Sequence, residues 1–387
     1  MRSFRPRLRV WLPLLVGAAL FSLGLFLEPL LRGASLVARA SGRDEGLAGH
    51  LARWDVRSFT VEDTAVPSRT GPLRGRVFRP ARPLGRTVLL IPGVHAEGID
   101  EPRLGALAGE LSRGGLTVIT LELPDLLRYA LTPREPDQIE DAVLWASARP
   151  EFAPDGRVGL MGISFSGGLS LVAAGRPSLA DKVAFTFSLG GHGDLSRVLS
   201  FLCTGLEEDG RRRAPHDYGV VILLLNVAGR LVPQAQVEGL REGILTFLRA
   251  SHLAMHDAPR AARAFAEARR QQAALPEPAA TLLGYVNARD VAALGPLLLP
   301  HVTDFASAAA LSPERSPAPP SPVFLLHGLE DTVIPAREST RLARALESRT
   351  RVHLLLTPLI THAEMDRGAG TPDVWRLADF WATLLDT

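Results

Sequence analysis

Cysteine is almost absent from this chain of 387 residues, in which Cys203 is the only one. A single cysteine excludes an intrachain disulfide and a cysteine-based zinc site, and it leaves the redox compartment open. Lysine is as scarce, with Lys182 alone, so nearly all of the 43 basic residues are arginines. The 41 acidic residues almost cancel them, and no basic stripe is visible. This balance argues against a nucleic-acid partner.

Long uncharged apolar runs are also few, although hydrophobic residues make up 46% of the chain and charged residues 22%. This composition can bury a large core, which excludes a disordered or collagen-like chain. The length suits one enlarged domain with additional segments better than two or three large domains.

One uncharged run, Val10 to Leu27, is long enough to cross a bilayer, since 18 helical residues span roughly 27 Å. We therefore expect an N-terminal transmembrane helix that acts as an uncleaved signal anchor. Four arginines precede the run, at positions 2, 5, 7 and 9, so the positive-inside rule predicts a single-pass membrane protein with its bulk on the extracytoplasmic side. Two alternatives are a signal peptide cleaved near Ala38–Ala40, which would give a secreted protein, and a buried core helix.

Short β-branched or apolar runs alternate with helical stretches over most of the remaining chain. This alternation predicts an α/β fold with a mainly parallel sheet covered by helices on both faces, and the first two runs could add an antiparallel edge. The predicted strands are Ser58–Val61, Leu73–Phe78, Thr87–Ile91, Thr117–Leu121, Val158–Met161, Val183–Phe187, Val323–Leu326 and Val352–Leu356.

The alternation stops between residues 195 and 320, where Ala-, Leu- and Arg-rich segments have helical composition. We expect a large helical cap insertion there, placed over one end of the sheet. The predicted organisation assigns 1–31 to the signal anchor, 32–54 to a linker, 55–194 to the first part of the α/β core, 195–320 to the cap and 321–387 to the second part of the core.

The strongest local motif is the segment from Val158 to Gly168, in which an apolar strand runs through small residues around Ser164 into an apolar helix. This pattern predicts a nucleophile elbow, a sharp strand-to-helix turn that exposes a serine hydroxyl. The small residues Gly162 and Gly167 suit the close backbone approach that such a turn needs. The backbone N–H of Phe165, at the start of the helix, could donate to a developing oxyanion.

With this motif, the chain resembles the α/β-hydrolase superfamily, particularly its dienelactone hydrolase-like and peptidase-like serine esterase branches. The segment from Thr87 to His95 occupies the place of the family's oxyanion loop, and the resemblance implies Val94 N–H as the second donor. Pro92 replaces the usual histidine. The segment from Leu326 to Pro335 is similar to the family's acid loop and implies Asp331 as the acid. His362 follows the last predicted strand, where the family keeps its histidine. The implied catalytic residues are thus Ser164, Asp331 and His362.

Several assignments keep an alternative. Ser166 stands where the elbow pentapeptide normally has glycine, which permits a shifted frame with Ser166 as the nucleophile. Asp194 is the rival acid, because some relatives place the acid one strand earlier. His95 and His192 lie on loops at the predicted catalytic edge and are candidate substrate-binding residues.

Other side chains have simpler interpretations. His252 and His256 have metal-ligand spacing on a helix, but Leu253 replaces the glutamate that a zinc protease would need, so we expect no metal site. Cys203 is interpreted as a buried small hydrophobe and the arginines at 211–213 as a solvated turn.

These observations predict a membrane-anchored serine hydrolase that cleaves carboxylic esters through an acyl-enzyme and needs no cofactor. Its partners would be a small-molecule ester or acyl substrate and the membrane, and the sequence indicates no protein partner. The same three residues could serve an acyltransferase, a peptidase or a thioesterase. A catalytically silent binding protein of the same fold is the alternative from another class.

Overall fold

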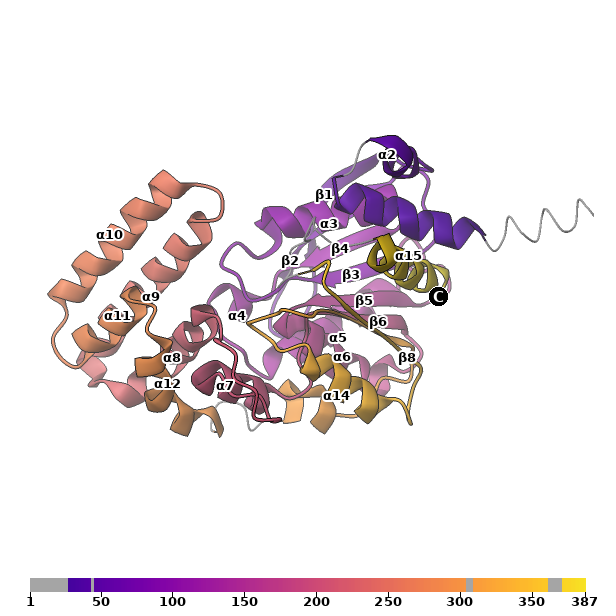
Figure 1. Cartoon of the computed structure of the whole chain (residues 1–387). Helices are drawn as coiled ribbons and strands as arrows, with labels where there is room; N and C mark the ends of the chain where they lie inside the picture. Colours follow the sequence, from indigo (N-terminus) through magenta and orange to yellow (C-terminus); the bar gives the residue numbers. More distant parts are fainter. Residues whose placement is uncertain (1–26, 43–44, 304–308, 361–370) are drawn as a thin grey trace, which may run out of the picture.

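A computed structural model describes residues 27–42, 45–303, 309–360 and 371–387, and Figure 1 shows their arrangement. Their strands form one eight-stranded sheet in the order β1-β2-β4-β3-β5-β6-β7-β8. The edge strands β1 and β2 are antiparallel to their neighbours, and all later pairings are parallel. The strands are β1 Phe59–Val66, β2 Leu73–Pro80, β3 Thr87–Ile91, β4 Thr117–Leu121, β5 Val158–Ile163, β6 Val183–Leu189, β7 Val323–Gly328 and β8 Val352–Thr357.

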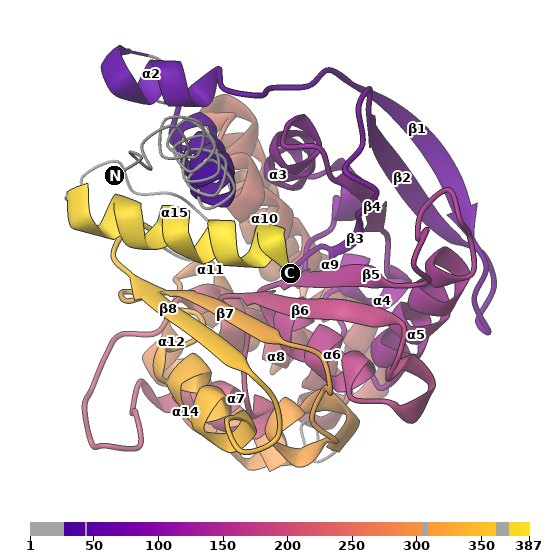
Figure 2. The same ribbon diagram turned by 90° about the vertical axis from the view of Figure 1, so that its right-hand side faces the viewer.

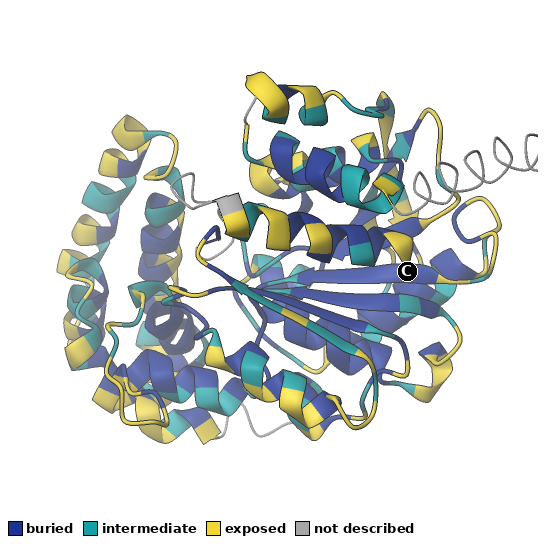
Figure 3. Cartoon of the chain, turned by 45° about the vertical axis from the view of Figure 1, so that its right-hand side comes forward, coloured by how far each residue is buried: buried dark blue, intermediate teal, exposed yellow. Residues whose placement is uncertain are grey.

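The central strands are apolar throughout because both of their faces are covered. Every residue of β3, β4 and β7 is buried, whereas most of the edge strand β1 is exposed. Figure 3 shows the same contrast between the buried sheet and the exposed outer surfaces of the helices. All eight predicted strands are present, so the predicted α/β sheet is confirmed, including its antiparallel edge.

Helices cover both faces of the sheet (Figure 2). On one face, α3 (Pro102–Arg113), α15 (Thr371–Asp386) and helical residues 27–40 share a buried apolar cluster. The other face is covered by α5 (Arg134–Ser147), α6 (Phe165–Ala174) and α14 (Arg337–Leu346). The short helix α2 (Gly46–Ala52) lies at the periphery, whereas α4 (Pro124–Leu127) lies between the sheet and the cap helices (Figure 1).

The predicted fold is corrected at its N-terminus, where the transmembrane helix is not supported. Among the described residues, no helix is both long and apolar enough to cross a membrane. Of the predicted span from Val10, only Leu27 lies within the described residues. The helical residues 27–40 that follow bury Leu36 and Val37 in the same apolar cluster as α15. A side chain at Gly33 would lie 2.1 Å from the carbonyl oxygen of Ala378, so the two helices are in close contact.

The described chain between β6 and β7 is mainly helical and adds no strand to the sheet, as the sequence indicates for the cap. Its helices are α7 (Leu195–Thr204), α8 (Asp217–Leu231), α9 (Gln234–Leu253), α10 (Ala258–Ala274), α11 (Ala279–Asn287) and α12 (Val291–Leu298). Figure 1 shows α9, α10 and α11 projecting furthest from the sheet, with α7, α8 and α12 between them and the core. The apolar residues of α8 belong to the same buried cluster as α5 and α6, so the cap and the core share one interior.

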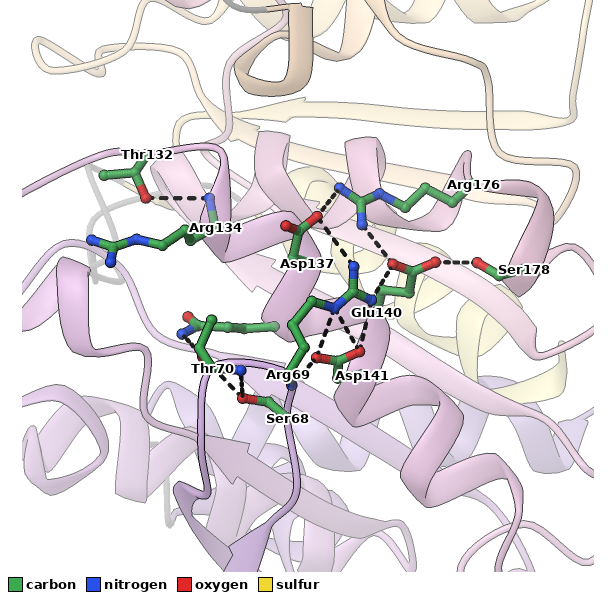
Figure 4. Close-up of polar contacts among 11 residues, drawn as sticks. Ser68, Arg69, Thr70, Thr132, Arg134, Asp137, Glu140, Asp141, Arg176 and Ser178 are labelled. Atoms are coloured by element: carbon green, nitrogen blue, oxygen red, sulfur yellow. Dashed lines mark hydrogen bonds and ion pairs between the residues drawn. The ribbon is translucent and has the colours of Figure 1, made fainter.

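A network of charged side chains fastens the edge hairpin to α5 (Figure 4). Arg69, in the turn between β1 and β2, lies 2.6 Å from a carboxylate oxygen of Glu140 and 2.7 Å from one of Asp141. Arg176 also pairs with Glu140, at 2.6 Å. Burial alone would raise the pKa of Glu140, but hydrogen bonds from Ser178, Arg69 and Arg176 outweigh burial and lower it.

Candidate functional site

Ser164 occupies the turn between β5 and α6 and has a strained backbone. Its φ of 57° and ψ of −132° lie outside the regions that side-chain-bearing residues ordinarily adopt. Hydrogen bonds hold the turn, since Ser164 N–H donates to the Leu189 carbonyl at 2.7 Å and Gly167 N–H donates to the Ser164 carbonyl at 2.8 Å. A serine forced into this conformation between a strand and a helix has the geometry of a nucleophile elbow.

The residues around Ser164 are small because the backbone approaches itself closely. A Cβ at Gly162 would lie 2.2 Å from the carbonyl oxygen of Ser166, and a Cβ at Gly167 would lie 2.2 Å from Ser188 Oγ. Both distances are far below van der Waals contact, so neither position accepts a larger residue without movement of the turn.

Ser166 is placed differently from Ser164. Its side chain is fully buried on the first turn of α6, and its hydroxyl donates to the Pro92 carbonyl oxygen at 2.5 Å. The structure therefore places Ser164 at the elbow, while Ser166 joins α6 to the loop after β3.

That loop, residues 92–97, lies beside the elbow. A Cβ at Gly93 would lie 3.4 Å from Ser164 Cβ, so the loop backbone contacts the serine directly. Val94 follows and is buried. On the other side, Phe165 begins α6, and the first N–H groups of a helix have no partner within the helix. The two predicted oxyanion donors are the N–H groups of Val94 and Phe165. They thus belong to residues on either side of Ser164.

Asp331 is held rigidly in the loop after β7. Its side chain is 1% exposed, and one carboxylate oxygen accepts from the backbone N–H groups of Val333 at 2.8 Å and Ile334 at 2.9 Å. The other oxygen lies 3.4 Å from Nε2 of the buried His327. Two backbone donors stabilise an ionised carboxylate. Strand β6 separates β5 from β7, so the two strand ends lie roughly 10 Å apart.

The third predicted member, His362, lies outside the described residues. Strand β8 pairs with β7 and ends at Thr357, and the described chain continues to residue 360. The structure therefore places Ser164 and Asp331 after β5 and β7, two parallel strands with β6 between them, and the position of His362 stays a prediction.

His95 contacts the cap. Its Nδ1 accepts from Glu97 N–H, so its Nε2 carries the proton and donates to Nδ1 of His252 on α9 at 2.8 Å. Glu97 also lies 3.2 Å from Nε2 of His252. Burial, followed by the neighbouring His252, lowers the pKa of His95 to about 4. His95 therefore joins the loop after β3 to the cap as a neutral imidazole at pH 7.

His192 exposes none of its surface and lies against the elbow helix. Its Nε2 is 2.7 Å from the Leu311 carbonyl oxygen, and its ring centroid is 5.5 Å from that of Phe165. A Cβ at Gly168 would lie 2.4 Å from this ring. Burial lowers the pKa of His192. The His192 ring thus packs under the first turn of α6 and has no exposed surface. The predicted substrate contact of His192 stays a prediction.

The other candidates have structural surroundings. Asp194 caps α7 by accepting from Arg197 N–H, and it pairs with Arg315 at 2.9 Å. Burial raises the pKa of Cys203 to about 12, which leaves the thiol protonated at pH 7. His256 packs on His252 with ring centroids 4.7 Å apart, and within the described ranges no group of three His, Cys, Asp or Glu side chains could hold a metal ion.

Two tyrosines at the site were missed by sequence analysis. Tyr218, at the start of α8, donates its hydroxyl to the Val94 carbonyl oxygen at 2.9 Å. Tyr129, after α4, packs edge to face on Tyr218, with ring centroids 6.0 Å apart. They lie about 90 residues apart in an insertion and in a loop, so no local motif could have revealed the pair.

An open surface depression of about 470 Å³ lies elsewhere, between helical residues 27–40, α2 and α3. Arg39, Arg53, Glu110 and Arg113 contribute its polar lining. None of the residues that line it belongs to the elbow, the loop after β3 or the acid loop.

No family model matches the chain, and no curated protein matches it. Solved structures do, among them an acylaminoacyl peptidase from Pyrococcus horikoshii at 13% identity, over 88% of this chain and 43% of that chain, with a TM-score of 0.47. An esterase from Pyrobaculum calidifontis matches at 16% identity over 92% of both chains, with a TM-score of 0.45. An esterase from Pyrococcus furiosus matches at 13% identity over 83% of this chain and 92% of that chain, with a TM-score of 0.44.

This chain spans under half the length of the acylaminoacyl peptidases that it matches. Identities and TM-scores at this level do not transfer an activity. The expected α/β-hydrolase-like fold is confirmed by the chain's own features: its mainly parallel sheet, its serine turn between β5 and α6, and its helical segment between β6 and β7.

Proposed function

We propose that the chain is a serine hydrolase that cleaves carboxylic esters through an acyl-enzyme. The observation that carries this proposal is the backbone of Ser164, which adopts a strained positive φ between a strand and a helix. The loop containing Gly93 and Val94 lies against this serine. A strained serine next to two candidate amide donors suits attack on an acyl carbonyl and has no evident value for packing.

In the proposed mechanism, Ser164 Oγ attacks the acyl carbon while its proton moves to His362. The oxyanion accepts hydrogen bonds from the N–H groups of Phe165 and Val94. Asp331, held by two backbone donors, orients the imidazole and stabilises its cation. The alcohol leaves with the proton from His362, and a water molecule then hydrolyses the acyl-enzyme by the same steps. No cofactor is needed for this chemistry.

The proposal is tested by hydrolysis of aryl esters of increasing acyl length, with Ser164→Ala as the decisive variant. We expect Ser164→Ala to lose at least about 10³-fold in kcat, because removal of the nucleophile leaves only binding and oxyanion stabilisation. Ser166→Ala is the matched control, since it removes a hydroxyl two residues away that donates to Pro92. It should keep much more activity than Ser164→Ala.

Two results would contradict the proposal. Equal activity in the parent chain and Ser164→Ala would remove Ser164 as the nucleophile. A folded parent chain with no esterase activity would favour a peptidase, a thioesterase or an acyltransferase if it acts on acyl-peptide anilides or thioesters. Inactivity on all of these substrates would favour a binding protein.

A further inference from the structure

We call residues 92–97 the oxyanion loop. Side chains hold this loop on both sides of the peptide group between Gly93 and Val94. The peptide between Gly93 and Val94 carries the N–H that we propose as the second oxyanion donor. On one side, the Pro92 carbonyl accepts from Ser166 Oγ at 2.5 Å. On the other, the Val94 carbonyl accepts from Tyr218 Oη at 2.9 Å. Glycine adopts many backbone conformations, so a peptide that follows Gly93 rotates easily unless its neighbours are fixed.

The two fixing groups come from different parts of the molecule. Ser166 belongs to the core helix α6, whereas Tyr218 belongs to α8, in the helical cap between β6 and β7. The cap therefore contacts the loop that carries the proposed donor, and it does so through a backbone carbonyl.

The direction of the Tyr218 hydrogen bond follows from its partner. Because the Val94 carbonyl can only accept, Tyr218 donates its one proton to it. Tyr129 supports this arrangement from the side, because its ring packs against the Tyr218 ring.

Helix α8 also holds the second tyrosine. Asn226 Nδ2 donates to the Tyr129 carbonyl at 2.8 Å, and the Tyr129 backbone has a positive φ of 58°. The two rings pack edge to face with centroids 6.0 Å apart. Burial, together with the neighbouring Tyr129, raises the pKa of Tyr218 well above 10, so its hydroxyl keeps the donated proton throughout the pH range of ester hydrolysis.

We propose that Tyr129 and Tyr218 are positioning residues for the oxyanion loop, so that cap helix α8 sets the rate of acyl transfer at Ser164. This inference rests on the proposed function. Neither tyrosine needs to touch the substrate. The Tyr218 hydroxyl holds the 93–94 peptide so that its N–H is in place before the oxyanion forms, and the Tyr129 ring supports the Tyr218 ring. This is the preorganisation that such sites require.

The test is steady-state hydrolysis of a short aryl ester by Tyr218→Phe, which removes one hydroxyl and keeps the ring. We expect kcat to fall roughly 10- to 100-fold with KM changed less than about threefold, because the lost interaction positions a group that acts in the transition state. The matched control is Tyr285→Phe on α11, in the same cap, which should stay close to the parent chain.

Tyr129→Phe keeps the ring that packs on Tyr218 and should lose less kcat than Tyr218→Phe, and the double variant should be little worse than Tyr218→Phe alone. Rates are normalised to the folded fraction measured by circular dichroism, so a loss of folding is not counted as a loss of kcat. A Tyr218→Phe variant within twofold of Tyr285→Phe would overturn the inference, as would a raised KM with unchanged kcat or additive losses in the double variant.

The outcomes also separate this inference from the proposed function. If Ser164→Ala abolishes activity and Tyr218→Phe does not reduce kcat, only the role of the tyrosines fails. If Ser164→Ala retains activity, the proposed function fails first.

Discussion

Ser164 and Ser166 differ in backbone conformation, since Ser164 has a positive φ at the elbow, whereas Ser166 lies within α6 and donates its hydroxyl to Pro92. Sequence analysis predicted the elbow because Gly162, Ser164 and Gly167 are small residues between an apolar strand and an apolar helix. It could not choose between the serines by spacing alone, since Ser166 occupies the usual glycine position. The contact from Ser166 to Pro92 is nonlocal, and only the fold brings these residues together.

His95 predicts an acid-sensitive stability. Its pKa is lowered from 6.5 to about 4, so between these pH values the unfolded chain binds a proton that the native chain does not. His95 therefore leaves the free energy of unfolding unchanged above pH 6.5. It lowers this free energy as the pH drops toward 4, by roughly 2 kcal/mol at pH 5. The groups around His95 are His252 on α9 and His256 just after it, with Glu101 and Arg103 nearby.

Urea unfolding at pH 7 and pH 5 measures this effect, with His95→Gln as the comparison because glutamine keeps an N–H donor toward His252. The parent chain should lose about 2 kcal/mol more than the variant between the two pH values. An equal loss in both proteins would show that His95 does not titrate as described.

At the scale of elements, the strands were easier to predict than the N-terminal helix. Runs such as Thr87–Ile91 are continuously apolar because both faces of a central strand are covered, and this composition is visible locally. The helical residues 27–40 bury Leu36 and Val37 against α15, whose sequence lies more than 300 residues away. Sequence analysis placed residues 32–54 in a linker, because no local pattern indicates that residues 27–40 pack on α15.

Replacement by alanine should have opposite effects on stability at two glycines, one on this closely packed helix and one on α3. Gly33→Ala should destabilise the protein by about 1–3 kcal/mol, because its Cβ would lie 2.1 Å from the Ala378 carbonyl oxygen and the helices would have to separate. Gly105→Ala, on α3, meets nothing within 4 Å and should be neutral or stabilising by up to about 1 kcal/mol. Urea midpoints compare the two, and equal shifts would contradict this contact.

At the scale of the whole molecule, the order of elements along the chain places the predicted chemistry at one edge of the sheet. The serine turn follows β5 and the acid loop follows β7, and both were located from local motifs and the family resemblance. The link between the cap and the oxyanion loop through Tyr218 and His252 was not foreseen. These residues have no periodic pattern that indicates which loop they contact, because that depends on how the cap packs on the core.

The most direct measurement is the mass-spectrometric mapping of a fluorophosphonate adduct on the folded chain. A fluorophosphonate reacts with an activated serine and leaves a covalent mark on that residue alone. The account predicts one adduct, on Ser164, which forms much more slowly in Asp331→Asn and His362→Ala. An adduct on Ser166 or on another residue, or no adduct on the folded protein, would contradict it.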